Sequence, residues 1–223
     1  MKQYQCFKKH KNLVLFFSGF AGDKSHFIPF LQGDFDFVIF YDYRDFDFFN
    51  MDFLNNYEKI TLVAFSMGVF VANKIINTLK LQDKITKKIA INGTEYGIHN
   101  DFGIPLKLFL LTARNFDLER FKLALFGEVY KDFKNSQNST SLLKDFYFLD
   151  ESKLKDELNF FCKNTQEPQS FLCWDRVFIS KNDYVFLAKN QVNFWQNKGN
   201  AKEICKIDLP HFPFFALSDF LCF

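Results

Sequence analysis

Residues Thr61 to Ile76 read TLVAFSMGVFVANKII, in which an apolar β-branched run, a turn of small residues and a helical pattern follow one another without a gap. The first four residues predict a buried parallel strand, because both faces of such a strand need apolar side chains. From Met67 onward the spacing predicts a helix with apolar positions on most of its faces. A strand that runs directly into a helix indicates an α/β fold built on a parallel sheet.

Ser66 lies at the turn, within the string AFSMG (residues 64–68), which is a variant of the G-x-S-x-G nucleophile elbow. In that motif a serine in a strained backbone conformation projects its hydroxyl above the end of the sheet. The residues two before and two after the serine must be small, because strand and helix pass close together there. Gly68 meets this demand, and Ala64 adds only one methyl group. The alternative is an ordinary turn whose serine caps the helix.

Apolar runs elsewhere predict further strands at residues 13–17, 37–41, 84–92, 177–180 and 204–207. Strands separated by helical patterns are typical of a doubly wound, mostly parallel sheet. Between residues 95 and 170 the sequence shows no strand pattern. Instead, amphipathic helices are predicted from Pro105 to Gly127 and over residues 142–161, with a polar bridge between them. We therefore predict one α/β domain over residues 1–223, with its core at 1–94 and 171–223 and an inserted helical cap at 95–170.

The composition limits the classes of function. With 223 residues, of which 48% are hydrophobic, the chain suffices for one full domain. Its formal net charge of +2 is too balanced to predict nucleic-acid binding. The polar arm at residues 1–12 lacks the apolar stretch of an export signal, and no apolar run has the length of a membrane span, so we expect a soluble cytoplasmic protein. Five cysteines without C-x-x-C spacing argue against a zinc site and a disulfide framework and predict buried reduced thiols. We expect neither a metal nor a cofactor.

Two further polar residues follow predicted strands. Asp183 comes just after the strand at 177–180, and His211 just after the strand at 204–207, so both are expected at the same sheet edge as Ser66. A serine hydroxyl is a weak nucleophile at neutral pH and needs an imidazole to take its proton, while a carboxylate orients that imidazole. The chain order Ser, Asp, His is that of the α/β-hydrolase fold. These three residues are therefore the predicted catalytic triad.

Two carboxylates compete with Asp183 for the role of the acid. Asp208 lies close to His211 in sequence, at the end of the last strand, and Glu95 follows an earlier strand, where some hydrolases place the acid. We favour Asp183 and keep both alternatives open. The remaining histidines, His10, His26 and His99, are expected to be exposed or locally hydrogen-bonded side chains without a catalytic part.

The small-residue loop SGFAG (residues 18–22) follows the strand at 13–17 and leads into a helix that is predicted to start near Asp23 or Ser25. α/β-Hydrolases place one backbone N–H of the oxyanion hole in such a loop. We therefore expect the N–H of Phe20 as one donor and the N–H of Met67, directly after the serine, as the other.

The strings LVLFFSGFAGD, YDYRDFD, VAFSMG, INGTEYGIHNDFGIP, ISKNDYVF and LPHFPF together resemble the BioG-type pimeloyl-carrier-protein methyl ester esterases, compact α/β-hydrolases of biotin synthesis. The similarity covers nearly the whole chain. It implies hydrolysis of the methyl ester at the far end of a pimeloyl chain that is held as a thioester on acyl carrier protein. It also implies the triad Ser66, Asp183 and His211, with the aspartate as its least certain member.

A cap rich in Leu and Phe would line a narrow apolar tunnel for the acyl chain and leave the carrier at its mouth. Cationic side chains of the cap helix, of which Arg114 and Arg120 are the candidates, are expected to meet the acidic carrier or its phosphate, although a solvated helix surface explains them equally well. The alternatives for function are an acyl thioesterase, a general short-chain carboxylesterase, or a non-catalytic module that binds acyl carriers.

Overall fold

The computed structural model describes residues 1–46, 51–135, 143 and 146–216 of the chain. A seven-stranded sheet runs through it in the order β1-β3-β2-β4-β5-β6-β7. The strands are β1 (Lys2–Cys6), β2 (Asn12–Phe17), β3 (Asp36–Tyr41), β4 (Lys59–Phe65), β5 (Lys87–Ile91), β6 (Cys173–Ser180) and β7 (Asn200–Ile207). All neighbouring pairs are parallel except β1 and β3. The predicted mostly parallel sheet is thereby confirmed.

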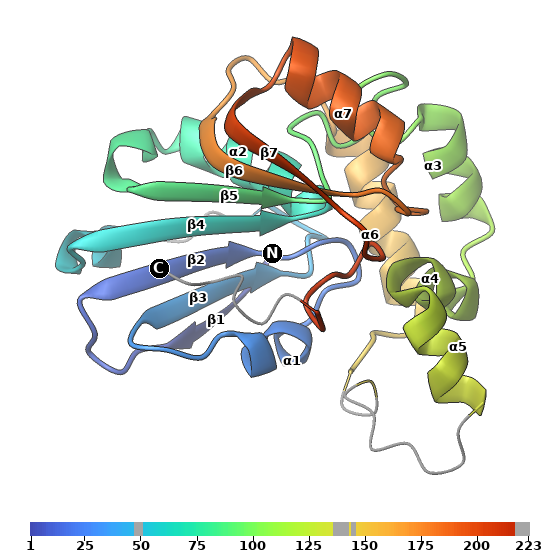
Figure 1. The fold of residues 1–223 in the computed structure, drawn as a ribbon, viewed down its shortest axis with the longest axis horizontal. Helices are drawn as coiled ribbons and strands as arrows, with labels where there is room; N and C mark the ends of the chain where they lie inside the picture. The colour runs from blue at the N-terminus through green and yellow to red at the C-terminus, as the bar shows by residue number, and fades with distance from the viewer. Residues whose placement is uncertain (47–50, 136–142, 144–145, 217–223) are drawn as a thin grey trace.

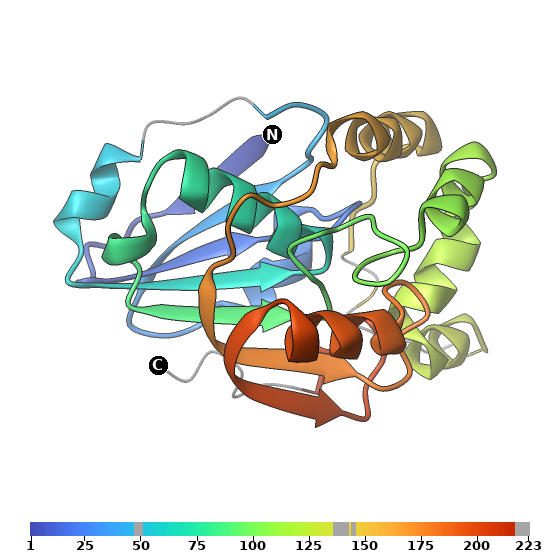
Figure 2. The same cartoon turned by 90° about the horizontal axis from the view of Figure 1, so that it is seen from above.

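The α-helices are α1 (Lys24–Phe27), α2 (Met67–Thr78), α3 (Leu106–Arg114), α4 (Leu118–Phe126), α5 (Glu128–Asn135), α6 (Glu151–Asn164) and α7 (Ala188–Asn197). Short 3-10 turns are η1 (Ile28–Phe30), η2 (Asp52–Asn56) and η3 (Gln82–Lys84). Helices α3 to α6 follow β5 in the chain and precede β6. They gather beyond the carboxyl ends of the parallel strands, where the arrowheads point in Figures 1 and 2.

The core has two layers, one on each face of the sheet. Along β4, Leu62 and Ala64 belong to one buried cluster, while Val63 and Phe65 belong to the other. Successive side chains of a strand point to opposite faces, so a strand covered on both sides must be apolar throughout. This requirement explains the uninterrupted apolar run that marks β4 in the sequence.

The polar N-terminal arm contains a strand that the sequence analysis did not predict. Residues Lys2 to Cys6 form β1, which pairs antiparallel with β3 in the register Lys2↔Tyr41 to Cys6↔Phe37. Strand pairing uses backbone groups, and an edge strand that is only partly buried tolerates polar side chains. For this reason a hydrophobicity pattern does not reveal β1.

The single helix predicted from Pro105 to Gly127 is two helices. Helix α3 ends at Arg114, and Asp117 then accepts a hydrogen bond from the backbone N–H of Arg120 (2.9 Å), which caps the start of α4. An aspartate at the N-cap stabilises a new helix start by about 1 kcal/mol. The end at Gly127 is as predicted, and its φ of 59° is a conformation that favours glycine.

The helix predicted over residues 142–161 is shorter at its start, because α6 begins at Glu151 after its N-cap, Asp150. Residues 142, 144 and 145 of that prediction, and most of the polar bridge before it, lie outside the described residues. Four of the five cysteines lie in the described part and are free thiols, but Cys6, Cys162 and Cys205 are partly exposed and Cys173 is exposed, so the prediction that they are buried is wrong. Cys222 lies outside the described residues. In the same part, no helix is long and apolar enough to cross a bilayer.

Candidate active site at the carboxyl end of the sheet

Ser66 lies between β4 and α2 in a backbone conformation that an L-residue rarely adopts, with φ 57° and ψ −127°. A residue held in such a region costs of the order of 1–3 kcal/mol, which the surrounding structure must supply. The Ser66 side chain makes no capping bond to α2, so the helix-cap interpretation is wrong. A Cβ on Gly68 would come within 2.2 Å of the Ser18 carbonyl oxygen, which explains why the turn needs glycine there.

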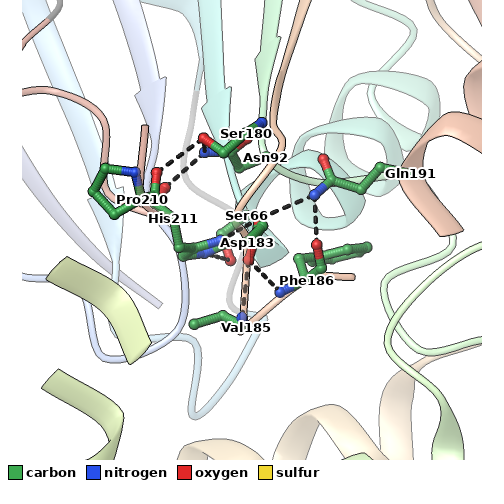
Figure 3. A network of polar contacts seen from close by, with 9 residues as sticks. All are labelled: Ser66, Asn92, Ser180, Asp183, Val185, Phe186, Gln191, Pro210 and His211. Atoms are coloured by element: carbon green, nitrogen blue, oxygen red, sulfur yellow. Dashed lines mark hydrogen bonds and ion pairs between the residues drawn. The ribbon is translucent and has the colours of Figure 1, made fainter. Parts of the chain in front are cut away.

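The structure brings Ser66, Asp183 and His211 into one hydrogen-bonded chain (Figure 3). The His211 Nδ1 lies 2.7 Å from Asp183 Oδ2, and its Nε2 lies 2.9 Å from Ser66 Oγ. A carboxylate can only accept, so Nδ1 carries the proton and the lone pair of Nε2 accepts from the serine hydroxyl. All three residues are buried, with 5% or less of their surface exposed. The arrangement can therefore move a proton from a nucleophilic oxygen to an imidazole.

The Asp183 carboxylate is held from several sides. Its Oδ1 accepts the backbone N–H groups of Val185 (2.9 Å) and Phe186 (2.7 Å). Its Oδ2 accepts the side-chain amide of Gln191 (3.0 Å) in addition to His211. These bonds fix the orientation of the carboxylate. Gln191 lies on α7, and no pattern in the sequence singled it out.

Asn92, at the end of β5, holds the loop that carries His211. Its Nδ2 donates to the His211 carbonyl oxygen (2.7 Å) and to Ser180 Oγ (2.8 Å), while its Oδ1 accepts the Ser180 N–H (2.7 Å). Ser180 Oγ in turn donates to the Pro210 carbonyl oxygen (2.9 Å). The network joins the ends of β5 and β6 to the histidine loop (Figure 3). Asn92 was not among the site residues predicted from the sequence, although an amide directly after the apolar run IAI (residues 89–91) was a signal.

The two rival acids are elsewhere. Glu95 accepts the Leu172 N–H (2.8 Å) and the Trp174 indole N–H (3.0 Å), both on its Oε1. Burial raises the pKa of the Glu95 carboxyl to about 8. Asp208 accepts from the Asn182 side-chain amide (2.8 Å). The carboxylate that contacts the His211 ring is that of Asp183.

The other histidines do not reach the site. His26 lies in α1, but it is buried rather than exposed, with its Nε2 bonded to the Tyr147 carbonyl oxygen. Burial lowers its pKa to about 4. His99 accepts the N–H groups of Asp101 and Phe102, which is the local bonding that was expected. His10 is partly exposed in the segment before β2.

A cavity of about 360 Å³ opens above Ser66 and His211. Phe20 and Met67, the predicted oxyanion-hole donors, both line it. Its walls are mostly apolar and come from the helices and connecting segments between β5 and β6: Ile104, Leu108, Phe109, Leu111, Phe116, Phe121, Ala124, Leu125 and Leu158. The volume and apolar lining are typical of a site for a small organic chain.

The two predicted cationic contacts differ in position. Arg120 lines the cavity, is highly exposed, and has its Nε 4.0 Å from Asp117 Oδ2. Arg114, in the last turn of α3, is exposed and does not line the cavity. Only Arg120 therefore reaches the opening of the site.

A family model described as "Pimeloyl-ACP methyl esterase BioG" matches residues 1–220. A curated relative from Bacteroides fragilis, named "Malonyl-[acyl-carrier protein] O-methyltransferase", is 33% identical over 93% of this chain. The chain spans only 41% of the length of that relative. A second relative, an uncharacterized protein of Haemophilus influenzae, is 30% identical over 87% of this chain and 86% of its own length.

Among solved structures, BioG from Haemophilus influenzae has a TM-score of 0.76 at 24% identity and covers 96% of this chain and 95% of its own. An α/β hydrolase enzyme from a Medee basin deep-sea metagenome has a TM-score of 0.61 at 10% identity, covering 94% of this chain and 86% of its own. At these identities the likeness concerns the fold. The predicted α/β-hydrolase fold is confirmed.

Proposed function

Because the chain belongs to the family of BioG pimeloyl-ACP methyl esterases, we propose that it hydrolyses pimeloyl-[acyl-carrier protein] methyl ester to pimeloyl-[acyl-carrier protein] and methanol. The observation that carries the proposal is the Ser66–His211–Asp183 hydrogen-bonded chain at the floor of an apolar cavity. The reaction needs no cofactor, because an activated serine and water suffice for ester hydrolysis.

In the proposed mechanism, Ser66 Oγ attacks the ester carbonyl carbon while His211 Nε2 takes the hydroxyl proton. The His211 proton then passes to the methoxy oxygen as the C–O bond breaks, and methanol leaves. Water, deprotonated by the same nitrogen, attacks the acyl-serine and releases the carboxylic acid and the serine hydroxyl. Asp183 stabilises the imidazolium in both steps.

The tetrahedral intermediate of each step carries an oxyanion. We assign its stabilisation to the backbone N–H groups of Phe20 and Met67. The packing of their loops supports this assignment, because a Cβ on Gly19 would lie 2.8 Å from Ser66 Cβ, so that the loop at residues 18–22 runs directly against the serine. Loss of one such donor typically costs about 10²–10³-fold in rate.

Residues 95–170 act in this proposal as the cap that selects the substrate. The apolar walls from α3, α4 and α6 suit a methylene chain and leave the thioester and its carrier outside. Arg120, at the opening, and Arg114, nearby on α3, would meet the acidic carrier or its phosphate. An enzyme that acts on such carriers would work in the cytoplasm.

The named relative supports this choice of substrate. A methyltransferase that acts on carrier-bound malonyl groups makes a methyl ester on an acyl carrier, and the proposed reaction removes one. The family name and the name of this relative thus both concern methyl esters on acyl carriers.

The test is mass spectrometry of the carrier after incubation of pimeloyl-[acyl-carrier protein] methyl ester with the purified protein and with Ser66→Ala. We expect loss of the methyl group with the thioester intact, and a decrease of about 10⁴-fold or more in the variant. Release of the free carrier thiol would show a thioesterase instead. If the protein does not cleave this substrate but cleaves short esters, it is a general carboxylesterase. If it cleaves no ester, the remaining alternative is a non-catalytic module that binds acyl carriers.

A further inference from the structure

Glu157 is a buried carboxylate on α6 that the proposed mechanism does not use. It is fully buried, 0% exposed, and both of its oxygens accept backbone N–H groups from distant loops. Its Oε2 accepts from Ala21 (3.1 Å), and its Oε1 accepts from Tyr43 (3.0 Å). Burying a carboxylate is costly unless its oxygens are hydrogen-bonded, and these two loops supply the hydrogen bonds.

The first loop is the one that carries Phe20. The Gly22 N–H donates to the Gly19 carbonyl oxygen (3.1 Å), which places Phe20 and Ala21 at the two central positions of a tight turn. Ala21 has a φ of 60°, the positive value that the second central position of a type II turn requires. Alanine is strained there, so the bond from its N–H to Glu157 stabilises a conformation that the sequence itself disfavours.

The second loop connects to the same turn. Tyr43 follows β3, and its hydroxyl lies 2.9 Å from the carbonyl oxygen of Ser18, the first residue of the Phe20 loop. Its ring packs against Phe161, one turn after Glu157 on the buried face of α6. Glu157 therefore holds the loop at residues 18–22 directly at Ala21 and indirectly, through Tyr43, at Ser18.

We propose that Glu157 is a positioning residue that holds the oxyanion-hole loop in place from α6, so that the Phe20 N–H points at the reacting carbonyl above Ser66. This inference rests on the proposed function. The helical insertion would then do more than line the substrate cavity, because it also orients a part of the catalytic machinery that belongs to the sheet core.

The carboxylate is the suitable group for this task. Two donors reach two different oxygens, and a glutamine could accept only one of them. Burial raises the pKa of Glu157 to about 7, although its two N–H bonds oppose the shift. Two nearby charged groups also affect the pKa of Glu157: Asp42 raises it and Arg44 lowers it. Asp42 and Arg44 form a bidentate ion pair with each other.

Glu95 offers a matched control. It is equally buried, but both of its bonds fall on Oε1, so a glutamine in its place keeps both of them. Its partners, Leu172 and Trp174, lie at the start of β6 and not in the Phe20 loop. Glu157→Gln and Glu95→Gln thus make the same chemical change with different consequences for the turn.

The experiment measures, for both variants and the wild type, kcat and KM on p-nitrophenyl butyrate and the affinity for an alkyl trifluoromethyl ketone, whose serine adduct carries an oxyanion. For Glu157→Gln we expect kcat and ketone affinity to fall together by about tenfold, with KM nearly constant, because the oxyanion donor is misplaced. Glu95→Gln should change neither by more than about twofold. Equal ketone affinity in the two variants would overturn the proposal.

Hydrogen–deuterium exchange provides a second readout that does not need activity. The peptide with residues 18–22 should exchange faster in Glu157→Gln than in Glu95→Gln, and equal rates would contradict the proposal. If Glu157→Gln does not fold, Glu157→Asp, which keeps two acceptors on a shorter stem, should show the same losses to a smaller degree. A wild type that cleaves no ester would refute the proposed function, while exchange would still decide the role of Glu157.

Discussion

The floor and the mouth of the cavity are built differently. At the floor, Ser66, Asp183 and His211 are buried at the ends of strands, and both oxygens of the aspartate are hydrogen-bonded. At the mouth, the two leucines of α3 that line the cavity, Leu108 and Leu111, remain 39% and 56% exposed. Under the proposed function, we expect the chemistry to depend on the fixed contacts at the floor and the choice of substrate to depend on the partly exposed helices at the mouth.

Changes at the floor should therefore reduce turnover of every ester, while changes at the mouth should alter the ranking of substrates. The largest effect is expected for Asp183→Asn. An amide would present an N–H₂ group to His211 and favour the wrong tautomer, so kcat should fall by about 10³–10⁴-fold for simple and carrier-bound esters alike. Initial rates on both substrates measure this.

Asp208→Asn is the control for Asp183→Asn. Asp208 lies only three residues before His211, but its carboxylate accepts a hydrogen bond from Asn182. The kcat of Asp208→Asn should therefore stay within about twofold of the wild-type value. A larger loss in Asp208→Asn than in Asp183→Asn would assign the role of the acid to Asp208.

Much of this floor could be predicted from the sequence, because strand ends in a parallel sheet converge and the three hydrogen-bonded residues follow three apolar runs. The contacts that support the floor could not. Glu157 and Ala21 are 136 positions apart, and Asn92 and His211 are 119 positions apart. Such pairs form only when α6 and the loops pack together, and the hydrophobic periodicity of the sequence gives no information about that packing. Strand β1 was missed for the related reason that edge pairing needs no apolar pattern.

The next prediction concerns the stability of the protein and a buried carboxylate outside the triad, Glu95. Glu95 has a raised pKa, so the folded state holds its proton while the unfolded chain releases it, and stability is lost as pH rises toward 8. Glutamine does not titrate. Between about pH 5 and 8, the free energy of unfolding of Glu95→Gln should gain on the wild type by about 1.4 kcal/mol per pH unit. Urea unfolding at several pH values measures this difference, and a constant difference would contradict it.

At the mouth, Phe121→Ala should enlarge the cavity. The Phe121 ring packs edge-on against Phe20 (5.1 Å between centroids) and lies 5.8 Å from Phe116. Its removal should lower kcat/KM for the pimeloyl chain by about tenfold through lost apolar contact, while short esters change little. A chain-length series of esters measures the effect.

Leu110→Ala serves as the control for Phe121→Ala, since Leu110 is exposed on α3 and does not line the cavity. It should leave the chain-length profile unchanged. Equal chain-length profiles in the wild type, Phe121→Ala and Leu110→Ala would refute the proposed contact between Phe121 and the acyl chain.

The smallest effect is expected for Arg120→Glu. Its side chain is highly exposed, so a contact with an acidic carrier is screened and changes mainly the association rate. We expect kcat/KM to fall about threefold for the carrier-bound ester at low salt and to stay constant for a free ester. Loss on both substrates would instead place Arg120 in the chemistry.

The proposed mechanism requires that Ser66 is an activated nucleophile. The most direct measurement is the rate of labelling by a fluorophosphonate, followed by peptide mapping, in the wild type, Ser66→Ala and His211→Ala. We expect one label on Ser66 in the wild type, none in Ser66→Ala, and much slower labelling in His211→Ala. A label on another residue, or equal rates with and without His211, would contradict the account.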